Sequence, residues 1–188
     1  LAEWKFSFPL VNSVAPADVL FPGFHVNTDC DPRINEVLLF SRLILLSFIS
    51  TIPYTDMVPE ILNCFSYTGG FSVYAVKAGA SKVINVDSSA ESLVLAEKNF
   101  FLNGIDSSKF ENTHDDVFKY LRKLRDTNRQ FDVIILDPPK FAESVSQIDK
   151  AARGYKDINL LALKLLKKNG ILFTFSCSGH IVPELFNK

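Results

Sequence analysis

The sequence predicts an α/β fold with an open, mostly parallel sheet and helices on both faces. From about residue 60, short apolar runs alternate with amphipathic stretches, and this alternation is typical of parallel strands joined by right-handed helical crossovers. One run, Phe131–Leu136, is dominated by apolar residues, as expected for a strand covered on both sides. Residues 1–59 lack this alternation. We therefore expect an N-terminal extension or cap over residues 1–59 and the functional domain over residues 60–188.

The first half of the domain predicts three strands, over residues 61–65, 82–86 and 110–113. A glycine-containing turn leads to a helix over residues 71–78, which stops at Gly79. The sequence Ser88-Ser89-Ala90-Glu91 is a capping box, in which a serine oxygen accepts a free helix amide and the glutamate reaches back. This helix is expected to end near Asn103, before Gly104.

The second half predicts two further helices and two further strands. A helix begins at Asp116, with Val117, Tyr120, Leu121 and Leu124 on one apolar face. Strand 131–136 follows, and Asp157 is expected to cap a helix that runs to Lys168, with lysines near its negative end. The pair Asn169-Gly170 then turns the chain into a fifth strand over residues 171–175.

Composition limits the class of protein. The chain is 47% hydrophobic and 22% charged, with a net charge of −1, so a nucleic-acid partner would have to be met by a local basic patch. The three cysteines are widely spaced and form no C-x-x-C pair, which indicates a reducing, cytoplasmic setting rather than a disulfide framework. Zinc is disfavoured, because the only close ligand pair is Cys177 with His180.

The most apolar segment spans residues 37–52. It is shorter than the ~20 residues that a membrane-spanning helix needs, and Arg42 interrupts it. We expect a buried helix, or a helix whose usual partner is missing, and no membrane partner. No basic segment with a cleavage site opens the chain, so no signal peptide is expected.

Glycine and acidic residues follow the carboxyl ends of the first three strands. Gly69 and Gly70 open a helix, Asp87 ends the second strand, and His114-Asp115-Asp116-Val117 follows the third. Ligands of open α/β sheets bind beyond these strand ends, where the strand order reverses. Glycine allows close approach of backbone to a ligand, a carboxylate accepts ribose hydroxyls, and the third loop can meet an adenine edge. Together these residues predict an adenosine-containing cofactor.

The type of cofactor follows from a missing pattern. The dinucleotide fingerprint G-x-G-x-x-G does not occur, so a pyrophosphate would lack its usual three-glycine turn. S-adenosylmethionine has no phosphate and does not need that turn. We therefore expect S-adenosylmethionine rather than a dinucleotide.

The residues best suited to catalysis follow the last two predicted strands. After residue 136 comes Asp137-Pro138-Pro139-Lys140-Phe141, where two prolines supply no amide donors and leave carbonyl groups for a flat ring with an amine edge. After the fifth strand comes Cys177, and neighbouring strands would place it in the same cleft as Asp137. A lone cysteine after a strand is also compatible with a packed core thiol.

These residues lie in stretches that resemble the RlmI-type class I methyltransferases, which make 5-methylcytosine in the large-subunit ribosomal RNA. The resemblance covers about residues 60–182 and is carried by "FSYTGGF", "DPPKF", "RGYKD" and "FSCSG". It implies a Rossmann-like class I methyltransferase fold, a cytoplasmic enzyme that depends on S-adenosylmethionine, and an RNA partner. The family normally has a seven-stranded sheet, and residue 188 precedes the helix and strands that would complete it, so we expect the C-terminal strands to be missing.

The resemblance also implies roles for individual residues. The expected cofactor-binding residues are Phe65, Ser66, Tyr67, Thr68, Gly69 and Gly70 for the methionine part, Asp87 for the ribose, Asp116 and Val117 for the adenine, and Asp137. The expected substrate-binding residues are Pro138, Pro139, Lys140, Phe141 and Arg153. Cys177 is implied as the nucleophile, with Asp137 as the acid. A related ribosomal family that methylates guanine shares "FSYTG" and "DPP" but has no cysteine at the equivalent of Cys177, so this residue favours cytosine.

Cytosine carbon 5 is a poor nucleophile, and a thiolate that adds to carbon 6 activates it. A free cysteine has a pKa of ~8.5, so we expect the site to lower the pKa of Cys177. The basic residues after the "DPP" loop, Lys140, Lys150, Arg153 and Lys156, are expected to contact phosphates. A second group, Arg122, Lys123, Arg125 and Arg129, is expected to be a solvated helix face.

Two features depart from the family. The RNA-binding module of the PUA type and the "GxxxDQR" stretch are not found, and "GFHVNTDCDPRIN" keeps only the glycine and Arg33. Three alternatives therefore remain open: a guanine or exocyclic-amine methyltransferase in which Cys177 is merely packed, a non-catalytic RNA- or ribosome-binding remnant, and a cysteine hydrolase using Cys177 and His180. The last is disfavoured, because no third residue orients the histidine.

Overall fold

The computed structural model describes residues 58–178, 181 and 185. The elements, in chain order, are β1 (Glu60–Cys64), α2 (Gly70–Lys77), β2 (Lys82–Asp87), α3 (Ala90–Leu102), the 3₁₀ turn η1 (Ser107–Lys109), β3 (Phe110–His114), α4 (Val117–Asp126), β4 (Phe131–Leu136), the 3₁₀ turn η2 (Val145–Gln147), α5 (Ile148–Leu165) and β5 (Leu166–Thr174). The expected N-terminal extension and the apolar segment 37–52 lie outside the described residues.

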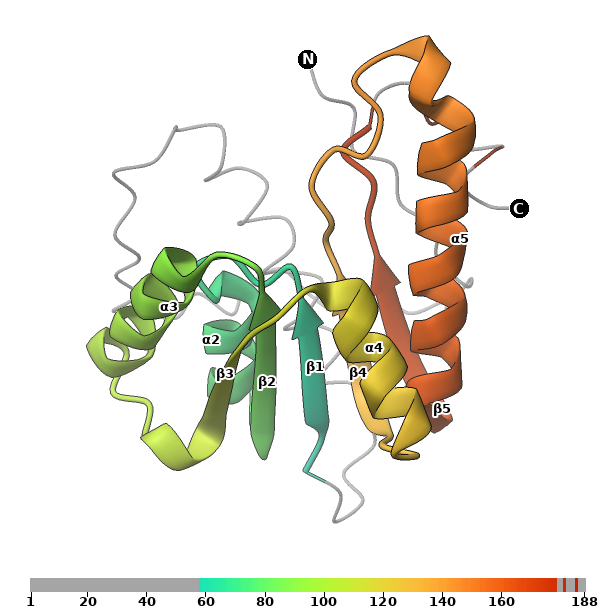
Figure 1. Cartoon of the computed structure of the whole chain (residues 1–188). Helices are drawn as coiled ribbons and strands as arrows, with labels where there is room; N and C mark the ends of the chain where they lie inside the picture. Colours follow the sequence, from blue (N-terminus) through green and yellow to red (C-terminus); the bar gives the residue numbers. More distant parts are fainter. Residues whose placement is uncertain (1–57, 179–180, 182–184, 186–188) are drawn as a thin grey trace, which may run out of the picture.

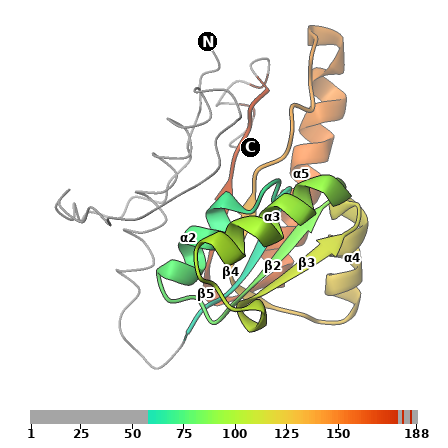
Figure 2. The ribbon, with the colours of Figure 1, turned by 90° about the vertical axis from the view of Figure 1, so that its left-hand side faces the viewer.

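The five strands form one parallel sheet in the order β3-β2-β1-β4-β5. Helices α2 and α3 cover one face, and α4 and α5 cover the other (Figures 1 and 2). The chain builds outward from β1 to β3 and then returns to place β4 on the other side of β1, so the strand order reverses between β1 and β4. The predicted α/β fold is confirmed, and the reversal marks where a ligand is expected to bind.

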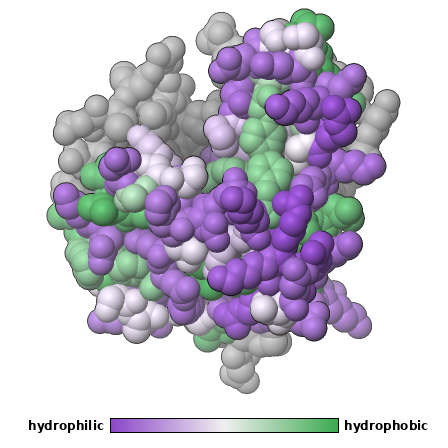
Figure 3. Space-filling model, in the orientation of Figure 1, coloured by the Kyte–Doolittle hydropathy of each residue, from purple (hydrophilic) through white to green (hydrophobic). Residues whose placement is uncertain are grey.

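Apolar side chains on both faces hold the layers together. Leu62 and Ile134 pack with α4 and α5, and Ile61, Val133 and Ile135 pack against α2. All five side chains are at most 1% exposed, and burial of each contributes roughly 1.5–3 kcal/mol. On the outer face shown in Figure 3, hydrophilic side chains cover α4 and much of α5. The division between core and surface thus follows the apolar periodicity of the sequence.

A row of asparagines crosses the first three strands, with Asn63 and Asn85 buried and Asn112 partly exposed. Asn63, Asn85 and Asn112 are paired in register, and Asn85 donates to Asn112 Oδ1 at 2.8 Å. Ser72 of α2 donates to Asn85 Oδ1 at 2.5 Å and accepts from Asn63 Nδ2 at 2.9 Å. A slip of one residue would turn these amides to the other face and leave buried polar groups unpaired. The row therefore fixes the register of β1, β2 and β3.

Three predicted boundaries in the second half are wrong. The last helix begins at Ile148 rather than Asp157 and ends at Leu165 rather than Lys168. Its buried stripe already starts at Ala151, and Gly154 is tolerated because a Cβ there would lie only 3.3 Å from the ring of Phe141. Strand β5 begins at Leu166 rather than after the Asn169-Gly170 turn, and its pairing with β4 is irregular between Phe131 and Val133.

The cap of α3 differs in detail from the predicted box. Ser89, not Ser88, is the N-cap, and its Oγ accepts from the Ser92 amide at 3.1 Å. Glu91 reaches the Ser89 hydroxyl, while the Ser89 amide donates to Asp87 Oδ1 at 2.9 Å. Asp87 is thus the carboxylate that completes this helix start.

Within the described residues, no helix is long and apolar enough to cross a membrane.

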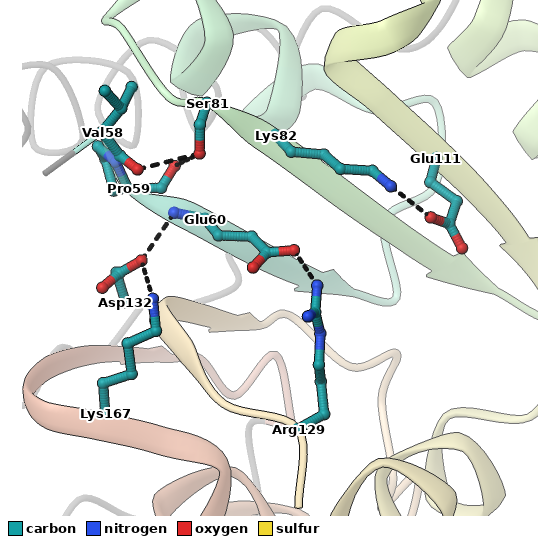
Figure 4. Close-up of polar contacts among 9 residues, drawn as sticks. All are labelled: Val58, Pro59, Glu60, Ser81, Lys82, Glu111, Arg129, Asp132 and Lys167. Carbon is teal, nitrogen blue, oxygen red and sulfur yellow. Dashed lines mark hydrogen bonds and ion pairs between the residues drawn. The ribbon is translucent and has the colours of Figure 1, made fainter. Parts of the chain in front are cut away.

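The amino ends of the strands are tied by polar contacts (Figure 4). Asp132 of β4 accepts from the Glu60 amide of β1 at 2.8 Å and pairs with Lys167 of β5 at 2.8 Å. Glu60 in turn pairs with Arg129, and Lys82 pairs with Glu111 at 2.7 Å. Asp132 is the only one of these carboxylates that contacts two neighbouring strands at once, so we expect it to matter most for stability.

Replacing Asp132 with alanine should lower the free energy of unfolding by about 1–3 kcal/mol, because the part-buried Glu60 amide loses its acceptor. Urea unfolding measures this change. Glu111→Ala is the matched control: both partners of its ion pair are more than a third exposed, and the loss should stay below about 1 kcal/mol. Equal losses at the two positions would contradict the assigned role of Asp132.

Candidate functional site

The loop after β1 has an unusual backbone. Phe65 (φ 58°), Tyr67 (φ 48°) and Gly69 (φ 74°) all adopt left-handed conformations. Such conformations are strained for an aromatic residue and persist only where surrounding contacts fix them. Here the Ser66 amide donates to Val86 O at 3.1 Å, and the Thr68 carbonyl accepts from Asn99 at 2.9 Å. Contacts from β2 and α3 therefore hold residues 65–69 in a preformed loop.

Gly69 meets two requirements at the end of this loop. Its φ of 74° suits glycine, and a Cβ there would lie 3.0 Å from Ala96 Cβ of α3. It is also the N-cap of α2 and has no side chain to cap the helix. The first amides of α2, beginning at Gly70, are thus left to a ligand at the positive end of the helix dipole.

Asp87 connects the first two strand ends. Its Oδ2 accepts from the Tyr67 amide at 2.8 Å, and its backbone carbonyl accepts from the Asp115 amide at 3.1 Å. A carboxylate has about four lone-pair positions, so Asp87 keeps capacity for ribose hydroxyls. Asp116 is the N-cap of α4 and accepts from the Lys119 amide, while Val117 is buried in the core. Only the backbone of Val117 is therefore available to a base.

The loops after β4 and β5 meet at the same edge. The Phe175 amide donates to Leu136 O at 2.9 Å, which extends the pairing of the two strands to their ends. Two residues further on, Cys177 Sγ lies 3.5 Å from the carbonyl oxygen of Pro138. Asp137, at the base of this loop, has its amide 3.5 Å from Cys64 O of β1. The structure thus brings Asp137, Pro138 and Cys177 together beside the loop after β1.

Burial controls the titration of this pair. Desolvation raises the pKa of Asp137 to about 6. Desolvation, followed by the nearby Asp137 charge, raises the pKa of Cys177, against smaller lowering effects of a backbone hydrogen bond and Lys140. The expectation that the protein lowers the pKa of Cys177 is therefore wrong for the chain alone. The reason is that the partly buried thiol faces a carboxylate.

The remaining candidates separate into two groups. Pro139, Lys140 and Arg153 are exposed near the strand ends. Phe141 instead turns toward the helices: its ring lies 4.7 Å from Tyr155, 5.9 Å from Phe118 and 6.3 Å from Phe65, measured between ring centroids. The aromatic ring of the "DPPKF" loop thus anchors the loop to α5 and to the loop after β1.

The arrangement at the switch point matches a known family. A protein-family model described as S-adenosylmethionine-dependent methyltransferase matches residues 54–186. The chain belongs to this family. The description of the family names S-adenosylmethionine, which is therefore the cofactor of this chain.

Individual relatives are closely similar to the chain. It is 58% identical over 129 residues to the ribosomal RNA large subunit methyltransferase I of Enterobacter sp. (strain 638), a match that covers 69% of this chain and 33% of that protein. The protein of the same name from Klebsiella pneumoniae (strain 342) is 57% identical over 129 residues, which cover 69% of this chain and 32% of that protein. The chain therefore spans about a third of the length of these curated relatives.

A solved structure supports the same family. A crystal structure of a protein described as a methyltransferase complexed with SAH superposes with a TM-score of 0.65 and 28% identity, covering 78% of this chain and 37% of that one. The geometry described above fits such a cofactor: the preformed loop, the open first turn of α2 and Asp87 offer donors and acceptors but no cluster of cations for a phosphate. When bound, S-adenosylmethionine supplies an electrophilic methyl group.

The sequence did not single out several residues that support the site. Asn99 holds the Thr68 carbonyl, and Ser178 accepts from the amides of Phe141 and Ala142 at 3.0 and 3.2 Å. Tyr155 lies within hydrogen-bond distance of Ser178 at 3.1 Å. Tyr155 lies in the "RGYKD" stretch on which the resemblance rests, and this was the only feature of the sequence that could have indicated a role for it.

Asp137→Asn should stabilise the protein at neutral pH. The folded-state pKa of Asp137 is about 6, above the usual ~3.9 of aspartate, so the folded state binds the proton more tightly than the unfolded state does. Its contribution to stability is therefore greatest below pH ~4 and falls as the pH rises to about 6. A shift of about two units corresponds to about 3 kcal/mol, so the asparagine variant should gain up to that amount at pH 7.5 and almost nothing at pH 4.

Urea unfolding of both proteins between pH 4 and 7.5 measures this difference. The exposed Asp126→Asn variant is the control and should show no comparable pH dependence. A stability difference for Asp137→Asn that is the same at pH 4 and pH 7.5 would contradict the raised pKa.

Proposed function

We propose that the chain is the catalytic part of an RNA methyltransferase that transfers a methyl group from S-adenosylmethionine to carbon 5 of cytosine in large-subunit ribosomal RNA. The observation that carries the proposal is the meeting of two loops: Cys177 Sγ lies 3.5 Å from Pro138 O, directly after Asp137. The names of the similar proteins support the choice of ribosomal RNA. Such a substrate places the protein in the cytoplasm.

The loop after β4 is suited to hold a pyrimidine. Pro138 and Pro139 have no amide donors, so this part of the loop presents carbonyl groups to the exocyclic amine of cytosine. The target base must leave its stack to reach a site at the strand ends. The preformed loop after β1 lies on the opposite side of β4 from β5, so the base would lie between Cys177 and the cofactor.

Cys177 and Asp137 perform the activation together. The thiolate sulfur forms a bond to carbon 6, the ring electrons move through carbon 4 to ring nitrogen 3, and Asp137 gives its proton to that nitrogen. The ring then has an enamine-like double bond between carbons 4 and 5, which makes carbon 5 nucleophilic. After methylation, the carbon 5 proton passes to water, the electrons of its bond restore the double bond between carbons 5 and 6 and expel the thiolate, and nitrogen 3 returns its proton to the Asp137 carboxylate.

The raised pKa of Asp137, about 6, supports its role as an acid. An ordinary aspartate would be almost wholly ionised at neutral pH, whereas Asp137 keeps a usable protonated fraction. Cys177, by contrast, must be deprotonated to attack the base. The positive charge of the sulfonium in the bound cofactor would favour this thiolate.

Basic residues around the strand ends support an RNA partner. Lys140, Lys150, Arg153 and Lys156 are exposed, and none forms an ion pair with a described residue. By contrast, Arg122, Arg125 and Arg129 each pair with a carboxylate. The first half of α5, which carries Lys150 and Arg153, rises beyond the strand ends (Figure 1). Their charge is therefore available to phosphate groups near the proposed site.

RNA that contains 5-fluorocytosine should form a covalent adduct with the protein when S-adenosylmethionine is present. Fluorine replaces the proton that must leave carbon 5, so the bond between Cys177 and carbon 6 persists. Denaturing electrophoresis and mass spectrometry of the peptide over residues 169–188, in which Cys177 is the only cysteine, detect the adduct. Cys177→Ala should abolish it, and the buried Cys64→Ala is the matched control that should retain it.

The alternatives give different outcomes in the same experiment. Methyl transfer without an adduct, with a product other than 5-methylcytosine in nucleoside mass spectrometry, would replace the proposal by an amine or guanine methyltransferase. Calorimetry with S-adenosylmethionine completes the tests, because a chain that binds RNA but not the cofactor would be a non-catalytic, RNA- or ribosome-binding remnant.

The double variant Lys150→Ala/Arg153→Ala should weaken RNA binding and reduce its dependence on salt. Each lost contact to a single-stranded phosphate lowers the slope of log affinity against log salt concentration by about 0.7. Fluorescence anisotropy at several salt concentrations measures the slope. Lys123→Ala/Arg125→Ala removes the same charge from α4 and should leave the slope unchanged. If both double variants had the same effect, RNA binding would reflect overall charge rather than this surface.

A further inference from the structure

Cys177 stands between two serines that are both buried and both contact one phenol. Ser176 and Ser178 are 7% and 3% exposed, and Tyr155 of α5 is 4% exposed. The Tyr155 hydroxyl lies 3.1 Å from Ser178 Oγ and also forms a hydrogen bond with the Ser176 side chain. The chain on both sides of Cys177 is therefore attached to the same point of α5.

Ser178 makes a second attachment, to the loop after β4. Its Oγ accepts from the Phe141 amide at 3.0 Å and from the Ala142 amide at 3.2 Å. A single hydroxyl thus joins the loop that follows Asp137 to the residue next to Cys177. Gly154 assists this arrangement, because its missing side chain lets the Phe141 ring lie close to α5.

The directions of these hydrogen bonds follow from donor counting. A hydroxyl has one proton and two lone pairs, and the two amides occupy both lone pairs of Ser178 Oγ. The Ser178 proton must therefore go to the oxygen of Tyr155. The phenol proton is then free to go to Ser176 Oγ, which also accepts from the Ser178 amide at 3.4 Å. The two serines and the phenol thus form one connected hydrogen-bond cluster.

We propose that Tyr155 and Ser178 are positioning residues, which fix Cys177 and the base-binding loop after Asp137 in one mutual geometry. This inference rests on the proposed function, because the geometry matters for an attack by Cys177 on a base held by that loop. Neither hydroxyl needs to touch the substrate. Both act by holding two loops whose attachments lie 37 residues apart in the chain, at Phe141 and Ser178.

Loss of the hydrogen-bond cluster should change both the pKa and the reactivity of Cys177, which a loss of packing alone would not do. The pKa of Cys177 is raised by desolvation and by the Asp137 charge, with Lys140 opposing. A loosened loop would let water reach the thiol and would move it away from Asp137. The thiol would then ionise at lower pH and react faster with a small reagent, while reaction with a positioned base would become slower. A less ordered site thus moves these two rates in opposite directions.

The test compares Tyr155→Phe and Ser178→Ala with the wild-type chain. Tyr155→Phe keeps the aromatic contact with Phe141 and removes only the hydroxyl. Both variants should lower kcat roughly 10- to 100-fold, the scale of a small misplacement of reacting groups, with no change in KM for S-adenosylmethionine. Alkylation of Cys177 by iodoacetamide, followed by mass spectrometry of residues 169–188 across a pH series, should be faster and should have a lower midpoint than in the wild type.

Tyr120→Phe is the matched control. Tyr120 is another largely buried phenol of the same hydrophobic cluster, and its hydroxyl contacts Thr113 rather than the two loops. It should leave kcat and the alkylation profile at their wild-type values. Folded Tyr155→Phe and Ser178→Ala variants with the wild-type alkylation profile would overturn the inference. This readout needs no RNA, so it decides the matter even if the wild-type chain forms no adduct and the proposed function fails.

Discussion

The site depends on the central place of β4, which pairs in parallel with β1 on one side and with β5 on the other. Parallel pairing in register brings the carboxyl ends of the three strands to one edge, where Cys64 lies opposite Leu136 and Leu136 opposite Thr174. The loop with Asp137 is therefore held between the loop of residues 65–69 and the segment with Cys177. This pairing places a carboxylate and a thiol together beside the open start of α2.

The half of the sheet on the cofactor side is fixed by polar contacts rather than by apolar packing alone. Apolar side chains tolerate a shift along a strand, whereas the asparagine row of β1, β2 and β3 does not, because the buried amides of Asn63 and Asn85 depend on Ser72 and Asn112 for their hydrogen bonds. The register that results puts Asp87 opposite His114 and lets its carboxylate reach the Tyr67 amide. The strained backbone at Phe65 and Tyr67 is maintained by this register.

The sequence predicts the parts of the molecule that depend on local pattern. The first four strands, and the placing of Asp87, Asp137 and Cys177 at strand ends, follow from apolar runs and their flanking residues. The start of α5 does not, because Gly154 is a weak helix former, and the close approach of Phe141 that accommodates it is a tertiary contact. Strand β5 passes through Asn169, at φ 66°, by an irregular pairing with β4 that only the folded sheet defines.

Properties that arise from burial could not be predicted from the sequence either. The direction of the pKa shift of Cys177 depends on desolvation and on the distance to Asp137, and neither can be seen in "FSCSG". The same is true of Tyr155 and Ser178, which are 23 residues apart in the chain and meet only because α5 packs over β4 and β5. Such residues are typical of a second layer around a site, where the side chains are ordinary and the geometry gives them their role.

In the proposed reaction, the protonated state required of Asp137 and the deprotonated state required of Cys177 are compatible because the pair carries one negative charge before and after activation. A neutral thiol beside a carboxylate and a thiolate beside a carboxylic acid have the same total charge and differ by the position of one proton. Activation therefore buries no additional charge, and its cost is set by the difference between the two proton affinities. Burial raises the pKa of Asp137 to about 6 and also raises the pKa of Cys177, so desolvation moves both proton affinities in the same direction. In the proposed reaction, the desolvation that weakens the fold at neutral pH would thus also keep a protonated fraction of Asp137 available as the acid.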